Sequence, residues 1–286
     1  LVLLDSGCLC CSVRGDLSRG LKSLFMRRLQ RKISGLSHIF IETTGLADPA
    51  PVIHTLQEDF FIAERYRLDG VVTAAAVTHV VGQLSRHFEA VKQVSMADRL
   101  LLTKCDLATA EESNTTSQRL ARLNPGAPQI FVHRGESAVE SILGCGLYDA
   151  AAKPEQVGQW LATEAAKVAH AHSHDHDPNR HDALVQAHVL RIDQALDWRA
   201  FLTALDVLLT TLGDRILRIK GLVSIANEPQ PRIVQCVQHV RYPELALPAW
   251  PDADHSTRLV FITRQLPREY IDKAFLMFCQ TQPVDV

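Results

Sequence analysis

The chain has no excess of charge of either sign and no long apolar run. Its formal net charge is -2, so it carries no strong field that would attract nucleic acid or an anionic membrane surface. No uninterrupted apolar stretch approaches the roughly 18 residues that a membrane-spanning helix needs, and no charged segment precedes a cleavable apolar core. We therefore expect a soluble, cytosolic protein that binds neither nucleic acid nor membranes.

Cysteines are few and unevenly spread, which excludes the disulfide framework of a small secreted protein. There are seven, an odd number, and three of them fall within four positions, at Cys8, Cys10 and Cys11. This spacing favours reduced thiols that serve metal or redox chemistry over thiols that cross-link the chain.

The first half of the 286-residue chain alternates between strand and helix patterns. A helix is expected from residue 16 onward, because leucines recur there at helical spacing beside arginines and lysines. Between the other helical stretches lie short apolar runs at 1–4, 39–41, 70–77, 99–103 and 129–133. This alternation predicts a parallel α/β sheet, in which ligands gather at the carboxyl ends of the strands.

The second half predicts a separate, smaller domain. Strands are expected at 185–192, 216–225, 232–241 and 258–264, with helices at 198–212 and 267–279. These patterns indicate an α+β domain whose sheet is covered on one face. The resulting division is an α/β domain at 1–150, a helical and His-rich linker at 151–184, and the α+β domain at 185–286.

The three clustered cysteines are candidate metal ligands. Thiolates bind Zn²⁺ well and also suit Cu(I), and a site with three protein ligands leaves a fourth position for another group. Two alternatives stay open. The cysteines could be small buried hydrophobes. Cys8 and Cys11 could instead form a redox pair ahead of a helix, in which case the chain would be a thiol oxidoreductase with a reversible disulfide.

Two loops after predicted strands are candidates for nucleotide chemistry. Glu42 and Gly45 follow the strand at 39–41, where an acidic side chain and a glycine N–H could sense a terminal phosphate and Mg²⁺. Thr103, Lys104 and Asp106 follow the strand at 99–103 and match a loop in which lysine packs on guanine and aspartate accepts from its N–H groups. An ordinary helix-starting loop and a surface turn are the respective alternatives.

The linker carries four alternating histidines, His170, His172, His174 and His176. Neutral imidazoles at this spacing could chelate a metal, which would make the segment an auxiliary metal-loading arm. A solvated polar linker is the alternative interpretation.

Taken in order, GCLCC, ETTGLADP and TKCD, followed by the His-rich linker and a terminal domain, resemble the CobW-like metal-handling GTPases. The resemblance implies a P-loop GTPase-like sheet, a CobW C-terminal domain, and GTP hydrolysis coupled to delivery of Zn²⁺ or cobalt to a client metalloprotein. It makes Cys8, Cys10 and Cys11 the metal ligands and Glu42 the residue that positions Mg²⁺ or the attacking water. Lys104 and Asp106 would select guanine.

The chain departs from the family pattern in three places. No G-x-x-G-x-G-K-T phosphate loop occurs in the sequence, so these residues alone are expected to hydrolyse GTP poorly. We expect the loop to precede Leu1 in a longer protein, which makes the sheet N-terminally incomplete here. Ala75 and Ala76 replace the usual Val-Asp, and Thr103 replaces the usual Asn. A nucleotide-independent metal-binding or scaffold protein is the alternative function.

Overall fold

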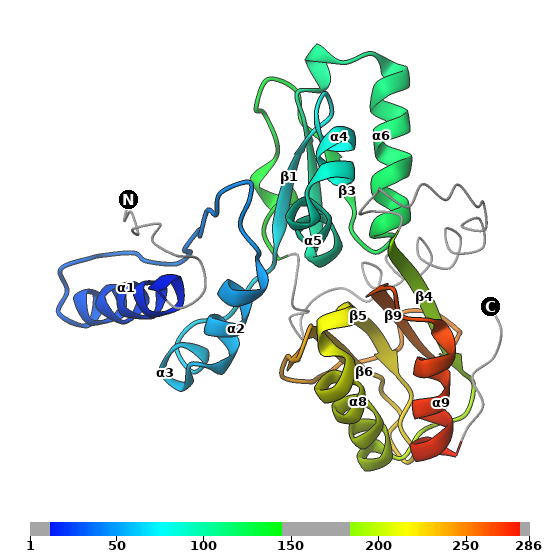
Figure 1. Cartoon of the computed structure of the whole chain (residues 1–286). Helices are drawn as coiled ribbons and strands as arrows, with labels where there is room; N and C mark the ends of the chain where they lie inside the picture. The colour runs from blue at the N-terminus through cyan, green and yellow to red at the C-terminus, as the bar shows by residue number, and fades with distance from the viewer. Residues whose placement is uncertain (1–11, 145–183, 281–286) are drawn as a thin grey trace. The chain divides into compact units, whose positions relative to one another are not determined.

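The structure is a computed structural model, which describes residues 12–144 and 184–280. The chain divides into two compact units, Leu1–Leu68 and Asp69–Val286 (Figure 1). The predicted strand at 1–4 and most of the predicted linker lie outside the described residues. Within the part of the chain that the structure describes, no helix is long and apolar enough to cross a membrane.

The described part of the first unit is built from helices. α1 (Ser12–Leu29) contains the helix predicted from residue 16 onward and is followed by α2 (Ala50–Glu58) and α3 (Phe60–Ala63). Leu17 and Leu21 of α1 are each 4% exposed and pack against α3. The apolar stripe of α1 therefore forms one side of a small core.

Asp59 holds this unit together between α2 and α3. Its carboxylate accepts from the backbone N–H groups of Phe61 and Ile62, which caps α3. It also accepts from the Ser18 hydroxyl at 2.7 Å and the Lys22 ammonium at 2.8 Å, both on α1. The hydrogen bonds from Lys22 and Ser18 lower the pKa of Asp59 to about 2.

The second unit begins with a parallel three-stranded sheet in the order β1-β2-β3. Leu100 and Leu102 are fully buried on one face, where the Thr73 hydroxyl also donates to the Gln93 carbonyl. The helices of this region contact one another and cover that face (Figure 1). The predicted strands at 70–77, 99–103 and 129–133 are confirmed. The elements are β1 (Val72–Ala76), α4 (Val80–Arg86), α5 (Phe88–Met96), β2 (Arg99–Thr103), η1 (Cys105–Leu107), α6 (Ala110–Leu123), β3 (Gln129–Phe131) and η2 (Val139–Ser141).

A six-stranded antiparallel sheet follows, in the order β4-β9-β5-β6-β7, with β8 paired to β6. Its two long helices lie side by side on one face, as Figure 1 shows, and bury Phe201, Phe261 and Phe275 completely. This is the predicted α+β arrangement. The elements are β4 (Val185–Ile192), α8 (Trp198–Leu212), η4 (Gly213–Arg215), β5 (Ile216–Val223), β6 (Arg232–Val237), β7 (Val240–Arg241), β8 (Leu245–Ala246), β9 (Thr257–Arg264) and α9 (Arg268–Cys279).

Two expectations for this sheet are wrong. The single strand predicted at 232–241 is a hairpin, because Gln238 takes a left-handed conformation (φ 49°) and turns the chain between β6 and β7. In addition, β5 in the middle of the sheet is covered on both faces and not on one. All eight residues of β5 are buried, because α5 packs against the face opposite the two long helices and Leu247 and Trp250 pack near Leu222.

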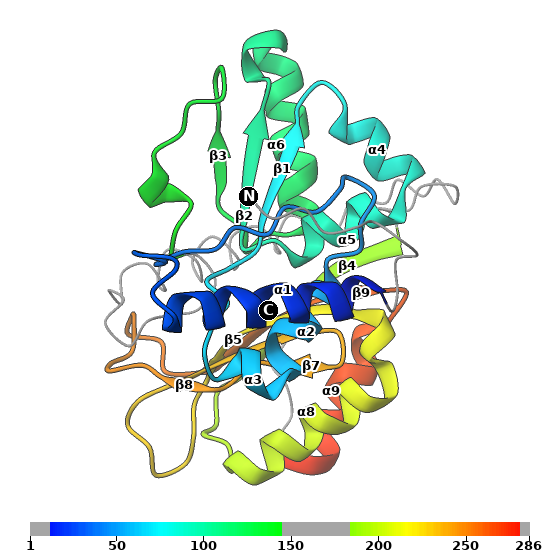
Figure 2. The ribbon, with the colours of Figure 1, turned by 90° about the vertical axis from the view of Figure 1, so that its left-hand side faces the viewer.

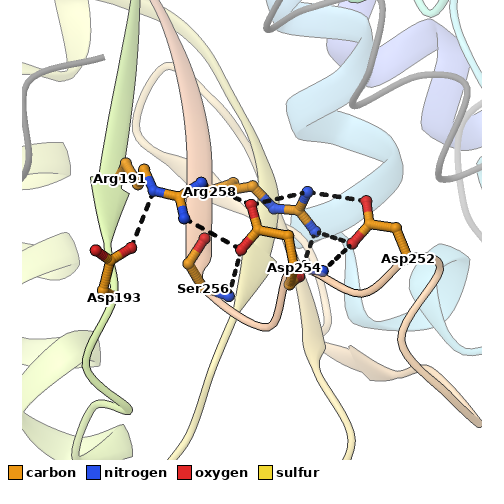
Figure 3. Close-up of polar contacts among 6 residues, drawn as sticks. All are labelled: Arg191, Asp193, Asp252, Asp254, Ser256 and Arg258. Carbon is orange, nitrogen blue, oxygen red and sulfur yellow. Dashed lines mark hydrogen bonds and ion pairs between the residues drawn. The ribbon is translucent and has the colours of Figure 1, made fainter.

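A charged network fixes the loop that leads into β9 (Figure 3). Arg191 forms a bidentate pair with Asp254, at 2.6 and 3.3 Å, while Arg258 forms one with Asp252, at 2.9 Å for both contacts. Partial burial raises the pKa of Asp254, but hydrogen bonds from Arg191 and Ser256 and the nearby Arg258 outweigh it and hold that pKa well below its usual range. The carboxylates are neutralised by arginines, which indicates a structural role for the network.

Candidate functional site

The three parallel strands end together at one edge of their sheet, where Figure 2 shows them side by side. The Val77 N–H donates to the Thr103 carbonyl at 3.0 Å, and the Val132 N–H donates to the Leu102 carbonyl at 2.8 Å. These bonds tie the chain leaving β1 and the chain leaving β3 to the last residues of β2. The loop after β2 therefore begins at a fixed point.

The loop after β2 is a tight turn. Lys104 takes a left-handed conformation (φ 59°), and its carbonyl accepts from the Leu107 N–H at 3.0 Å. Cys105 is buried and its thiol donates to the Leu102 carbonyl at 3.0 Å, which anchors the turn to the strand. The turn leaves Lys104 and Asp106 exposed. A lysine stem and an exposed carboxylate are the two groups that the sequence predicts would contact guanine.

A second turn lies beside this loop, and the sequence analysis missed it. Arg134 (φ 52°) and Gly135 (φ 80°) form a two-residue turn, closed by the Glu136 N–H donating to the His133 carbonyl at 2.9 Å. The Arg134 N–H lies 3.4 Å from Asp106 Oδ1, a long hydrogen bond. The glycine after a strand signals a turn, but nothing local indicates that the turn meets Asp106.

An open pocket of about 460 Å³ lies between the start of α6 and β3. Its lining is mostly apolar and includes Cys105, whose thiol anchors the loop, and Phe131, which is 47% exposed. The volume suits a small organic ligand or an aromatic ring. The pocket therefore gives the loop after β2 an open, mostly apolar surface on one side. It is lined by Cys105, Ala108, Ala110, Ser113, Asn114, Phe131 and His133.

Glu42 and Gly45 lie in the first unit, and the strand predicted before them is wrong. Residues 33–44 form no helix or strand, and Phe40 is 74% exposed. An extended segment becomes a strand only when a neighbour completes its hydrogen bonds, and no strand pairs with residues 39–41 within 12–144 and 184–280. Glu42 is exposed, and a Cβ added at Gly45 would meet nothing within 4 Å. The loop ends where Asp48 accepts from the Ala50 N–H at 3.0 Å and starts α2.

The candidate metal ligands lie outside the described residues. This holds for Cys8, Cys10 and Cys11 and for the four alternating histidines of the predicted linker, His170, His172, His174 and His176. Within 12–144 and 184–280, no group of three or more His, Cys, Asp or Glu side chains is placed to hold a metal ion.

Comparison with known proteins identifies both halves of the chain. The CobW/HypB/UreG nucleotide-binding domain matches residues 1–131, and the cobalamin synthesis protein CobW C-terminal domain matches residues 185–279. Over 272 residues the chain is 30% identical to the zinc chaperone YjiA of Escherichia coli, covering 95% of this chain and 80% of that protein. The chain belongs to the CobW-like family. The match to a CobW C-terminal domain begins at the first residue of β4 and ends at the last residue of α9.

Other relatives of this CobW-like chain carry similar names. The zinc chaperone CobW of a Sinorhizobium species is 24% identical, covering 92% of this chain and 75% of that protein. The zinc-regulated GTPase metalloprotein activator 1 of Schizosaccharomyces pombe is 32% identical over 43% of this chain and 29% of its own length. The crystal structure of Zn(II)-bound YjiA GTPase from E. coli has a TM-score of 0.71 at 27% identity, covering 92% of this chain and 77% of that one. These likenesses support the P-loop GTPase-like fold predicted for the α/β half.

Proposed function

We propose that this chain is a GTP-dependent metallochaperone that delivers zinc to a client metalloprotein. The observation that carries the proposal is the exposed Lys104 and Asp106 loop at the end of β2, in a chain similar to a zinc chaperone over 95% of its length. Cobalt is the alternative cargo. In this proposal GTP binding and hydrolysis change the affinity of the chain for its metal, so that the cargo is released to the client.

The guanine loop fits its ligand by hydrogen-bond chemistry. A carboxylate only accepts, and guanine presents two adjacent donors, its N1–H and its 2-amino group, whereas adenine does not present that pair. The long contact from Arg134 leaves Asp106 with free acceptor capacity. The exposed Lys104 stem would cover the face of the base, and Thr103 would fix the start of the loop at the half-buried end of β2.

The remaining predicted residues complete the proposal. Glu42 would position Mg²⁺ or the attacking water. The N–H of Gly45, a residue at which even an added Cβ would meet nothing within 4 Å, would approach the terminal phosphate. Cys8, Cys10 and Cys11 would hold the cargo metal, with the linker histidines as an auxiliary loading arm. Three thiolates leave one coordination position for a ligand from the client, which suits transfer better than permanent binding.

Exchange of the guanine-reading carboxylate for an amide tests nucleotide recognition. In Asp106→Asn the side chain offers one donor and one acceptor, which no longer match guanine but match xanthine, whose C2 carries an oxygen. We expect fluorescent GTP to bind at least tenfold more weakly and fluorescent XTP to bind more tightly than to the unchanged protein. Asp193→Asn, a control with the same charge change at a side chain that is 57% exposed, should alter neither affinity.

The scaffold alternative rests on the lack of a phosphate-loop motif among these 286 residues. It predicts that zinc binds while fluorescent GTP does not, whereas micromolar GTP affinity excludes it. For the cargo site, replacing Cys8, Cys10 and Cys11 by serine should abolish tight, stoichiometric zinc binding. Full zinc affinity in that triple variant would refute the cysteine assignment.

A further inference from the structure

The second face of the C-terminal sheet carries buried charges that the proposed function does not use. Arg218 and Lys220 of β5 are 5% and 7% exposed, while Ile219 between them points into the core beneath the two long helices. Lysine and arginine are almost never this deeply buried unless they are paired. Their burial places a charged cluster where the C-terminal sheet meets the α/β half of the same unit.

Both cations converge on one carboxylate. Asp98, 4% exposed, lies between α5 and β2. The Arg218 guanidinium donates to Asp98 Oδ1 and to the Met96 carbonyl, and the Lys220 ammonium lies 3.5 Å from the same Oδ1. Asp98 Oδ2 accepts from the Val71 N–H at 3.0 Å, just before β1. One side chain thus joins the starts of β1 and β2 to the middle of β5.

The C-terminal end of α5 also lies beside the two cations. Arg218 and Lys220 both contact Asp98, and the partial negative charge at a helix C-terminus favours a nearby cation. The Asn124 amide, which follows α6, donates to the carbonyls of Val94, Ser95 and Ala97 at 2.8, 3.2 and 2.9 Å. The last turn of α5 is therefore held by side chains from two other elements.

The buried ion pair is closed in this structure. Separating the partners inside the protein would leave an uncompensated buried charge, which is strongly unfavourable. Asp98 and Arg218 are 120 residues apart in the chain, so the closed state exists only when the two sheets are docked.

β2 connects this cluster to the guanine loop. The strand starts directly after Asp98 and ends at Thr103, about 16 Å away for five residues at roughly 3.3 Å each. It pairs with β1 on one side and β3 on the other. The Val77 and Val132 N–H groups bond to its carboxyl end, so these two amides report on the position of that end.

We propose that Asp98, Arg218 and Lys220 form a latch through which docking of the C-terminal sheet sets the position of β2 and of the loop at its far end. The link to nucleotide rests on the proposed function: a guanine nucleotide on the Lys104 and Asp106 loop and the docked sheet then stabilise each other, because such coupling is reciprocal. The position of the loop depends on the latch whether or not nucleotide binds.

Amide hydrogen exchange tests the latch without nucleotide. In Arg218→Met we expect exchange at least tenfold faster at Arg99, beside the cluster, and also at Val77 and Val132, which report on the far end of β2 and are each 4% exposed. Arg199→Met, an exposed arginine on α8, is the matched control and should leave all three amides unchanged.

The Val77 and Val132 amides show whether the Asp98 cluster affects the far end of β2 or only the residues beside it. Faster exchange confined to residues 96–99, with Val77 and Val132 as in the unchanged protein, overturns the proposal. If Arg218→Met does not fold, Lys220→Met is measured at the same amides, with a smaller increase expected because its contact is longer, and no increase overturns the proposal.

Nucleotide binding is measured on the same variants. Arg218→Met should bind fluorescent GTP more weakly than Arg199→Met does. If the unchanged protein binds no GTP, the proposed function is refuted. The hydrogen-exchange data would still show whether the latch positions the far end of β2. Equal GTP affinities in the two variants overturn the reciprocal coupling.

Discussion

The close packing of β5 against β9 predicts that one added methyl group strongly destabilises the fold. Gly221 of β5 pairs with Leu259 of β9, and a Cβ added at Gly221 would lie 2.0 Å from the Arg258 carbonyl oxygen and 2.8 Å from the Leu259 Cα. Both atoms belong to backbone, which cannot rotate away. Ordinary contact needs about 3.5 Å, so the two strands must separate by roughly 1.5 Å at the centre of the sheet.

We expect Gly221→Ala to lower the free energy of unfolding by at least about 3 kcal/mol. Overpacking contributes roughly 1–3 kcal/mol, and each weakened ladder hydrogen bond adds about 1 kcal/mol. For a unit of this size the melting temperature should fall by about 6–12 °C, measured by circular dichroism on the full chain. Because the clash is with backbone, a compensating side-chain change cannot restore the lost stability.

The same substitution at Gly82 is the control. Gly82 is exposed on α4, and its added Cβ would meet only the flexible Arg86 guanidinium at 3.3 Å. Alanine favours a helix over glycine by up to about 1 kcal/mol, so Gly82→Ala should leave the melting temperature unchanged or raise it. A Gly221→Ala protein that melts within about 2 °C of the unchanged protein would refute the reasoning.

Three further predictions concern pH, a histidine and a thiol. Because the pKa of Asp59 is lowered from 3.8 to about 2, its stabilisation is present above pH 4 and is lost as the pH falls toward 2. The difference in unfolding free energy from Asp59→Asn should be roughly 2 kcal/mol at pH 6 and should shrink at pH 2; a pH-independent difference contradicts this. Gly213→Ala would place a Cβ 2.3 Å from the His239 ring, which forms a hydrogen bond with the Leu209 carbonyl at 2.7 Å. This substitution alone should lower the free energy of unfolding by about 1–2 kcal/mol. In a His239→Ala background it should lower that free energy far less, because the ring that it would meet is absent. Burial raises the pKa of the Cys236 thiol well above its usual range, so mass spectrometry should find Cys236 unlabelled by maleimide until the protein unfolds.

Elements with strong patterns were predictable from the sequence. β2 at 99–103, β4 at 185–192 and α8 at 198–212 have the predicted bounds. Each has a continuous apolar run or a clear period and lies between polar or glycine-containing stretches. The tight turn after β2, which we propose reads guanine, was noticed for the same reason, because its candidate groups lie in consecutive residues.

Features that depend on distant partners were not predictable. Phe40 and Ile41 have strand propensity, but a strand also needs a neighbour to pair with. The left-handed turn at Gln238 has no glycine to announce it. The sequence patterns predicted a sheet covered on one face, and only the fold reveals that Asp98 and α5 cover Arg218 and Lys220 on the other.

The proposed function requires that guanine nucleotide binding and metal binding are coupled in one chain. The direct measurement is the zinc affinity of the full chain, determined by chelator competition with and without a non-hydrolysable GTP analogue. We predict at least a tenfold change in zinc affinity on adding the analogue, and no change in Asp106→Asn. Equal zinc affinity of the unchanged protein in both conditions would contradict the account.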